Sequence, residues 1–200
     1  MEKPAKTDFP VVELVRDRWS PRAFSDYLPS FEELGSLMEA ARWAASCYNG
    51  QPWRFILARK DQEELYKAIF GCLVDKNQEW AYQAPVLGVL VVSKTFEHNG
   101  KPNPWRDFDC GLATGQLALQ AESLDLKVHM MAGFHKDKAK ETFNIPEEFE
   151  PLVAFAIGKK GDPDTLPEEL AEREKAPRER KNLKELVFGK EWGKPAEWLE

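Results

Sequence analysis

The apolar and polar positions along the chain follow patterns that predict a mixture of strands and helices. Two segments, Ala84 to Ser93 and Leu152 to Gly158, are almost wholly apolar. Strands covered on both faces have this composition, so both segments are expected in the centre of a sheet. Shorter strands are predicted at Phe55 to Ala58 and at Val128 to Gly133.

Helices are expected where apolar residues recur every three or four positions. Ser30 and Glu33 form a capping box, and the helix that they open is predicted to end near Asn49. Further helices are predicted at residues 9–18, at 61–73 with Asp61 and Glu64 as its start, at 105–124 and at 136–143. Long helices together with a few strands predict an α+β layer fold.

The longest predicted helix, residues 105–124, carries small residues on one side. Gly111, Gly115 and Ala118 lie there at helical spacing, so another helix can approach closely. This face serves either tight packing inside one subunit or the contact between two subunits.

The composition changes after Gly158. Residues 159–181 contain prolines and a dense run of charges, which predicts an extended, solvated arm. Apolar residues then return at Leu183, Leu186, Val187, Phe188 and Trp192. They need a surface to bury against, either on this chain's own core or on a partner.

Composition and charge narrow the class of protein. Two hundred residues, 42% of them hydrophobic, give one domain with a sizeable core, or one domain with an arm. The formal charge of −6 disfavours nucleic acid as a partner. There is no apolar run of about 18 residues for a membrane helix, and MEKPAKTDFP lacks the apolar core of a signal peptide. We therefore expect a cytoplasmic protein with neither a membrane nor a nucleic-acid partner.

Motifs of several other classes are absent. The three cysteines, at positions 47, 72 and 110, have neither CxxC spacing nor a zinc-like pairing with histidine. No metal ligand is therefore predicted, and free thiols in a reducing compartment are expected. The sequence has no GxGxxG, P-loop, HExxH or GxSxG motif, and its three histidines are too scattered to suggest a hydrolytic triad.

Two polar clusters suit a flat, phosphorylated ligand. In residues 40–55, AARWAASCYNGQPWRF, a helix-like run ends in short polar residues just before a strand. Backbone N–H groups and short side chains can approach a flat polar ligand there. Upstream, Arg18 and Arg22 stand four residues apart with Ser20 between them, a set that suits a phosphate monoester.

In this order and spacing, the segments resemble the FMN-dependent nitroreductase family. The resemblance runs from Phe9 to Gly158 and is carried by RWSPRAF at 18–24, AARWAASCYNGQPWRF at 40–55, NQEWAYQAP at 77–85, GLATGQLALQAESLDL at 111–126 and MAGF at 131–134. It implies a nitroreductase-like α+β fold, with a central, mainly antiparallel sheet flanked by helices and an extended C-terminal arm. It also implies a homodimer with two FMN sites at the subunit interface. Residues 1–158 would then form the FMN-binding domain, and residues 159–200, the arm of the same domain, would pack on the partner subunit.

The resemblance assigns two groups of residues to the phosphate end of the cofactor. The first group matches the family's phosphate and ribityl contacts and comprises Arg18, Trp19, Ser20 and Arg22. The second group matches the basic pair that returns to the phosphate from the tail and comprises Arg180 and Lys181, with Arg178 as a competitor for that role.

Further residues match contacts to the flavin ring. The segment that the partner subunit brings over the flavin corresponds to Ala45, Ser46, Cys47 and Asn49. Asn77 matches a polar contact to the isoalloxazine edge, and Ala132 and Gly133 match the strand whose backbone N–H points at flavin N5. No side chain is assigned a catalytic role.

Three positions depart from the family pattern. Ala45 stands where proline is frequent, which predicts a looser turn. Asp125 stands where glycine usually makes the left-handed stop of the long helix, a conformation that Asp tolerates at some cost. Trp80 stands where some members place a lysine near the flavin pyrimidine edge, which leaves redox potential and substrate range open.

The implied function is ping-pong oxidoreduction with NAD(P)H as co-substrate. NAD(P)H reduces FMN at N5, and a nitroaromatic, quinone or similar small-molecule acceptor is then reduced in the same place. One alternative is a specialised relative, such as a reductive dehalogenase or a flavin-cleaving enzyme, which the short loop from Phe96 to Trp105 disfavours. The other alternative is an FMN-binding module without turnover.

Overall fold

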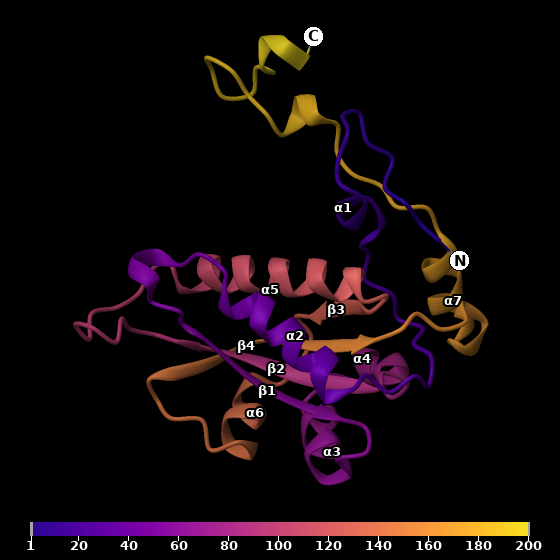
Figure 1. Ribbon diagram of the computed structural model, residues 1–200, viewed down its shortest axis with the longest axis vertical. Coiled ribbons are helices and arrows are strands. Elements are labelled where there is room, and N and C mark those ends of the chain that lie inside the picture. The colour runs from indigo at the N-terminus through magenta and orange to yellow at the C-terminus, as the bar shows by residue number, and fades with distance from the viewer. Residues whose placement is uncertain (1, 200) are drawn as a thin grey trace.

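Four strands form one antiparallel sheet in the computed structural model, which describes residues 2–199 (Figure 1). The strands are β1 (Trp53–Arg59), β2 (Val86–Ser93), β3 (Lys127–Met131) and β4 (Phe149–Gly158). They lie in the order β1-β2-β4-β3, and every neighbouring pair is antiparallel. The two apolar segments are the middle strands, and every residue of β2 is buried. The predicted α+β class with a mainly antiparallel sheet is therefore confirmed.

Helices cover both faces of the sheet. Successive side chains of β2 point to opposite faces, and since all of them are buried, both faces must be covered. On one face, Val86, Leu90 and Val92 pack with α2 (Phe31–Arg42) and α5 (Arg106–Ser123). On the other face lie α3 (Glu63–Gly71), α4 (Asp75–Ala81) and α6 (Lys136–Thr142).

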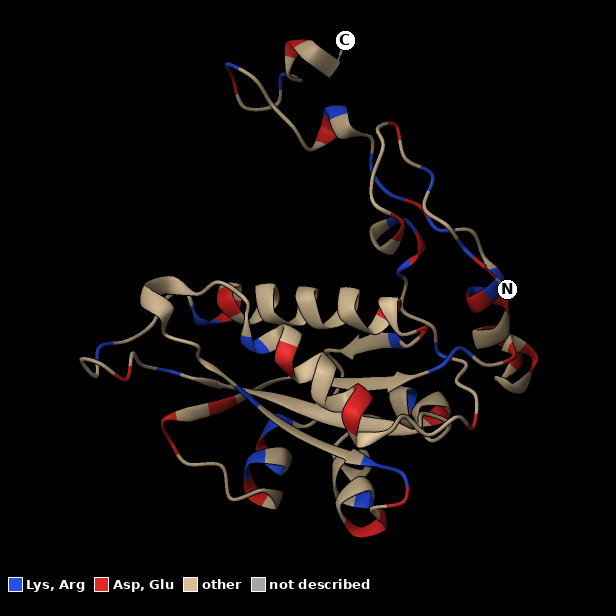
Figure 2. Ribbon diagram, viewed as in Figure 1, with Lys and Arg blue, Asp and Glu red and all other residues tan. Residues whose placement is uncertain are grey.

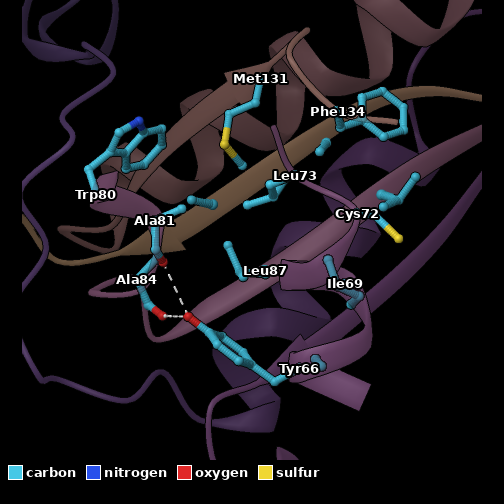
Figure 3. Packing of buried hydrophobic residues seen from close by; sticks show 14 of the residues in the cluster. Tyr66, Ile69, Cys72, Leu73, Trp80, Ala81, Ala84, Leu87, Met131 and Phe134 are labelled. Atoms are coloured by element: carbon cyan, nitrogen blue, oxygen red, sulfur yellow. Dashed lines mark hydrogen bonds between the residues drawn. The ribbon is translucent and has the colours of Figure 1, made fainter. Parts of the chain in front are cut away.

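Figure 3 shows the second of these cores at close range, including the hydrogen bonds of the Tyr66 hydroxyl. The Tyr66 hydroxyl lies 2.6 Å from the carbonyl oxygen of Ala84 and 3.2 Å from that of Ala81. These contacts satisfy a buried hydroxyl. Burial raises the pKa of Tyr66, so the hydroxyl keeps its proton and donates it.

The capping box at the start of α2 is confirmed. Ser30 Oγ accepts the Glu33 N–H at 3.1 Å, and Glu33 Oε2 accepts the Ser30 N–H at 2.7 Å. The helix ends at Arg42, however, so the prediction that it continues to Asn49 is wrong. Tyr48, Asn49 and Gln51 have φ angles of 51°, 53° and 41°, which an α-helix cannot accommodate.

Asp125 adopts the predicted left-handed conformation, with φ 55°. The Leu126 N–H donates to the Ala121 carbonyl at 2.8 Å, and the Asp125 N–H donates to the Glu122 carbonyl at 3.1 Å. This pair of bonds is a Schellman motif, which closes α5 and turns the chain toward β3.

Several predicted boundaries need correction. α1 is limited to Glu13–Asp17, and α3 begins at Glu63 without a side-chain cap, while Asp61 pairs with Arg59 instead. β3 ends at Met131, and β4 begins at Phe149. α4 was not predicted. Its sequence, DKNQEWA, is too short to show a helical repeat of apolar residues.

The first part of the arm is folded, so the expectation of an extended, solvated segment at residues 159–181 is wrong there. α7 (Glu168–Lys175) follows a short 3-10 turn, η2 (Pro163–Thr165), and buries Ala171 and Glu174. α7 was not predicted, because its buried face includes the charged Glu174 and so lacks an apolar pattern.

The outer arm, residues 176–199, is extended and leaves the body of the molecule beside the N-terminal segment (Figure 1). It carries the short 3-10 turns η3 (Leu183–Glu185) and η4 (Glu197–Leu199). Its apolar residues do not reach the core: Trp192 is 92% exposed and Leu186 is 56% exposed. Trp192 packs only locally, with its ring 5.0 Å from the ring of Phe188.

Candidate functional site

Arg18 and Ser20 line an open hollow against the small-residue face of α5. The hollow has a volume of about 410 Å³. Its other walls come from α5 and β3 and consist of Gly111, Thr114, Gly115, Ala118, Leu119, Val128 and Met130. Two of the predicted phosphate contacts thus lie beside the small-residue face of α5.

Arg22 lies against the arm, beside Glu174. Its guanidinium Nη1 is 3.8 Å from Glu174 Oε2, and its side chain remains 30% exposed. Trp19, the residue between Arg18 and Ser20, is buried, and within residues 2–199 its indole Nε1 has no hydrogen-bond partner. The Lys3 ammonium lies 4.7 Å from the centre of the Trp19 ring.

His129, on β3, contacts the Arg18–Arg22 segment at Pro21. Its Nδ1 lies 2.8 Å from the Pro21 carbonyl oxygen. Burial lowers the pKa of His129 to about 4. The ring is therefore neutral near pH 7, and Nδ1 carries the proton that it donates to the carbonyl.

Trp80 is a core residue, which corrects its predicted place at the edge of the flavin. It is 1% exposed. Its ring centre lies 4.5 Å from that of His129 and 6.3 Å from that of Phe24. The Trp80 ring therefore supports the histidine beneath the Arg18–Arg22 segment.

Asn77 and Gly133 are brought into direct contact. Asn77 Nδ2 donates to the Gly133 carbonyl at 2.8 Å, and the Val74 N–H donates to the same oxygen at 3.2 Å. A Cβ at position 133 would lie 2.9 Å from both Asn77 Nδ2 and Val74 Cγ2, so any larger residue would force these side chains or the backbone to shift. Ala132 is exposed just after the end of β3, which places it on a turn rather than in the predicted strand.

The Ser46–Asn49 segment lies beyond the N-terminal end of α5 (Figure 1). The Cys47 N–H faces both carboxylate oxygens of the buried Asp109, at 3.2 and 3.1 Å. Burial raises the pKa of Asp109, although the Cys47 N–H opposes that shift. Ala45 is exposed, and Asn49 lines a separate hollow of about 310 Å³. In one chain, this segment therefore does not join the Arg18 hollow.

The basic residues of the outer arm face the N-terminal segment. Arg180 and Lys181 line a hollow of about 360 Å³ together with Ala5, Lys6 and Asp8. Arg178 lines the same hollow and also donates to the carbonyl oxygens of Lys3 and Arg16, at 2.7 and 3.0 Å. Figure 2 shows Lys and Arg spaced along both of these neighbouring segments.

The positive charges of Arg18 and of the outer arm both act on the pKa of Arg178. Burial lowers the pKa of Arg178, and the charges of Arg18 and Arg180 lower it further. The carboxylates of Glu122 and Asp17 act on the pKa of Arg178 in the opposite direction.

Three residues that shape the site were not predicted: His129, Asp109 and Glu174. Each is a titratable side chain that holds a backbone segment through a contact distant in sequence. Only His129 carries a sequence signal, because it interrupts an otherwise apolar strand.

The sequence matches the Nitroreductase family over residues 15–159. A protein of Mycolicibacterium smegmatis named "Uncharacterized 15.4 kDa protein in ask 5'region" is 32% identical over 149 residues, covering 71% of this chain and 99% of that protein. A Bacillus subtilis protein named "Putative NAD(P)H nitroreductase YdgI" is 25% identical, covering 76% of this chain and 88% of that protein.

Solved structures agree with this match. One described as "the oxidoreductase containing FMN" has a TM-score of 0.88 and 39% identity, covering 94% of this chain and 95% of that chain. A nitroreductase family protein of Clostridium difficile 630 has a TM-score of 0.70 and 26% identity, covering 92% and 99% of the two chains. The chain belongs to the nitroreductase family and has its fold, and it is a flavin-dependent oxidoreductase.

The residues present fit a flavin mononucleotide. Arg18 and Ser20 offer a charged donor and a hydroxyl beside an open hollow, and a phosphate is the ligand that such a pair prefers. Gly133, which Asn77 contacts, has no side chain, so the backbone after the end of β3 is open to a flat ring. Family membership supports FMN as the cofactor and NAD(P)H as the co-substrate.

Proposed function

We propose that the protein is an FMN-dependent NAD(P)H oxidoreductase that reduces nitroaromatics, quinones or similar small acceptors. The single observation that carries this proposal is the hollow in which Arg18 and Ser20 lie beside the small-residue face of α5. Family membership, the FMN of one similar structure and the NAD(P)H in a relative's name support it.

The phosphate of the cofactor is assigned to Arg18 and Ser20, with Arg180 and Lys181 closing over it from the arm. Arg22, Trp19 and the nearby backbone complete this end of the site. A phosphate dianion would be attracted by the positive charges of Arg18, Arg180 and Lys181, so binding should be stronger at low ionic strength.

The flavin ring is assigned to the turn after β3. Asn77 fixes Gly133, and the backbone N–H at Ala132 or Gly133 would then donate to flavin N5. Bound FMN would supply the redox chemistry, a two-electron transfer from NAD(P)H to the acceptor in two half-reactions. The chain's own part is to bind, orient and exclude water, so no side chain is given a catalytic role.

A homodimer would bring the Ser46–Asn49 segment of the partner over the ring. Trp105, Phe108 and Leu112 expose large apolar surfaces at the start of α5, with 55%, 64% and 38% of each accessible. Such a patch on one helix is typical of an interface. The exposed apolar residues of the outer arm supply a second surface of the same kind.

An anaerobic titration tests the function. The protein should carry one FMN per chain, released by acid as FMN and not FAD. NADPH or NADH should bleach the bound flavin, and a nitroaromatic or quinone should restore its colour. Bound flavin that neither nucleotide bleaches would contradict the proposal and favour a binding module without turnover.

A further inference from the structure

Helix α7 buries one carboxylate among several exposed ones. Glu174 is 1% exposed, whereas Glu168, Glu169 and Glu172 on the same helix are exposed. A buried carboxylate is unfavourable unless hydrogen bonds and a cation compensate it. The contacts of Glu174 therefore indicate what this residue does.

Within residues 2–199, the hydrogen bonds and the ion pair of the Glu174 carboxylate go to one short segment near the proposed cofactor site. Oε1 accepts the backbone N–H of Arg22 at 2.7 Å and that of Ala23 at 3.1 Å. Oε2 faces the Arg22 guanidinium, with Nη1 at 3.8 Å. One side chain thus contacts both the backbone and the charged head of Arg22.

The opposite side of this segment is fixed as well. His129 Nδ1 donates to the Pro21 carbonyl at 2.8 Å, and the Gly161 N–H donates to the Ala23 carbonyl at 2.8 Å. Residues 21–23 are therefore held between β3, the start of the arm and α7. Of these supports, Glu174 alone contacts the Arg22 side chain.

The geometry at Oε2 leaves Arg22 able to bind a second group. Glu174 Oε2 is buried and, within residues 2–199, has no hydrogen-bond partner. The guanidinium lies just beyond hydrogen-bonding distance from it and is 30% exposed. Its remaining N–H groups are free to face a ligand while the carboxylate restrains the head.

We propose that Glu174 is a positioning residue for the cofactor, and that it acts through Arg22. It fixes the Arg22 backbone and restrains the guanidinium, so less ordering is needed when the cofactor binds. This inference rests on the proposed function, because it takes Arg22 as a cofactor contact.

The test is Glu174→Gln in the full-length protein. The amide oxygen can still accept the two backbone N–H groups, but the NH₂ group then faces the guanidinium, donor against donor. We expect the Kd for FMN to rise about tenfold, the scale of one lost charge-assisted contact. Glu172→Gln, which removes an exposed charge from the same helix, is the matched control and should leave the Kd unchanged.

A double-mutant cycle separates positioning from general damage to the fold. In an Arg22→Ala background, Glu174→Gln should have no further effect on the Kd for FMN. Glu174→Asp, which keeps the charge but withdraws it, replaces the Gln variant if that variant does not fold, and it too should weaken binding. An equal loss with and without the Arg22 side chain, or no loss at all, overturns the inference. A wild-type protein that binds no FMN would instead refute the proposed function.

Discussion

At the scale of single residues, His129 links the proposed site to pH. Its half-buried ring lies between Trp80 and the Pro21 carbonyl, and desolvation lowers its pKa from 6.5 to about 4. The unfolded chain keeps the ordinary value, so as the pH falls the unfolded state takes up the proton first. The stability from neutral His129 is therefore complete above pH 6.5 and is lost as the pH falls toward 4.

His129→Gln should make stability less dependent on pH in that window. The amide can still donate to the Pro21 carbonyl but does not titrate. The wild-type protein should lose roughly 3 kcal/mol more than the variant between about pH 6.5 and 4. Urea denaturation at a series of pH values measures this difference, and parallel curves for the two proteins would show that His129 is not buried in its neutral form.

Gly133→Ala should disturb the turn after β3. The new Cβ would lie 2.9 Å from Asn77 Nδ2 and from Val74 Cγ2, and such overpacking costs about 1–3 kcal/mol. We expect a lower thermal midpoint for the apoprotein and weaker FMN binding, because Asn77 and the backbone must shift apart.

Gly35→Ala is the matched control for this change. Position 35 lies in α2, and a Cβ there meets no atom within 4 Å. Alanine is favoured over glycine in a helix by about 1 kcal/mol, so the control should be neutral or more stable. A Gly133→Ala protein that behaves like the control would remove the turn from the site.

Residue identity suggested side chains that could contact the cofactor, but it did not reveal the residues that hold the site's backbone segments in place. Arg18, Ser20 and Arg22 were predicted as a phosphate set; the structure places Arg18 and Ser20 at one hollow, whereas Arg22 lies beside Glu174. Glu174 contacts a residue 152 positions away, His129 one 108 positions away, and Asp109 one 62 positions away. Such contacts exist only once the sheet and its helices are assembled, so no local pattern reveals them.

At the scale of elements, the end of α5 stores a small amount of strain. Asp125 occupies the left-handed region with φ 55°, and its carboxylate lies 3.1 Å from the Lys159 ammonium. The conformation is unfavourable for Asp by comparison with Gly. The exposed ion pair returns little, because exposed pairs contribute about 0–1 kcal/mol.

Asp125→Gly should therefore stabilise the protein, by about 0.5–1 kcal/mol. Denaturant unfolding measures the change. Asp125→Asn is the control, since it removes the charge and keeps a side chain that tolerates the left-handed region. If the glycine variant is no more stable than the asparagine variant, the strain at position 125 is negligible.

Elements with strong periodicity were predicted well, and weakly patterned ones were not. β2 and residues 152–158 of β4 are almost wholly apolar, and α2 has its capping box, so both kinds of signal stand out locally. α4 and α7 are short, and their helical state depends on packing against the body more than on their own sequence.

At the scale of the whole molecule, the outer arm and the start of α5 leave large apolar surfaces uncovered. Trp192 is 92% exposed and Trp198 is 65% exposed. Within residues 2–199, no helix is both long and apolar enough to cross a membrane. A second copy of the chain is the partner that the proposed function requires. Obligate interfaces usually bury more than about 2,000 Å².

Deleting residues 182–200 should weaken both the dimer and the retention of flavin. The deletion removes the apolar part of the outer arm and leaves Arg180 and Lys181 at a free end. These two residues would then lose ordering entropy each time they reach the phosphate. Analytical ultracentrifugation should show more monomer at low concentration, and both the FMN affinity and the thermal midpoint should fall.

Full-length protein with Trp192→Ser and Trp198→Ser tests the cause of that effect. Both side chains are largely exposed in the single chain, so on this chain alone their replacement should change stability little. If they anchor the arm on a partner, the double variant should reproduce most of the loss seen with the deletion, because burial of apolar surface stabilises the contact. Unchanged dimerisation and FMN affinity in both proteins would show that the outer arm contributes to neither, and Arg180 and Lys181 would then be removed from the proposed site.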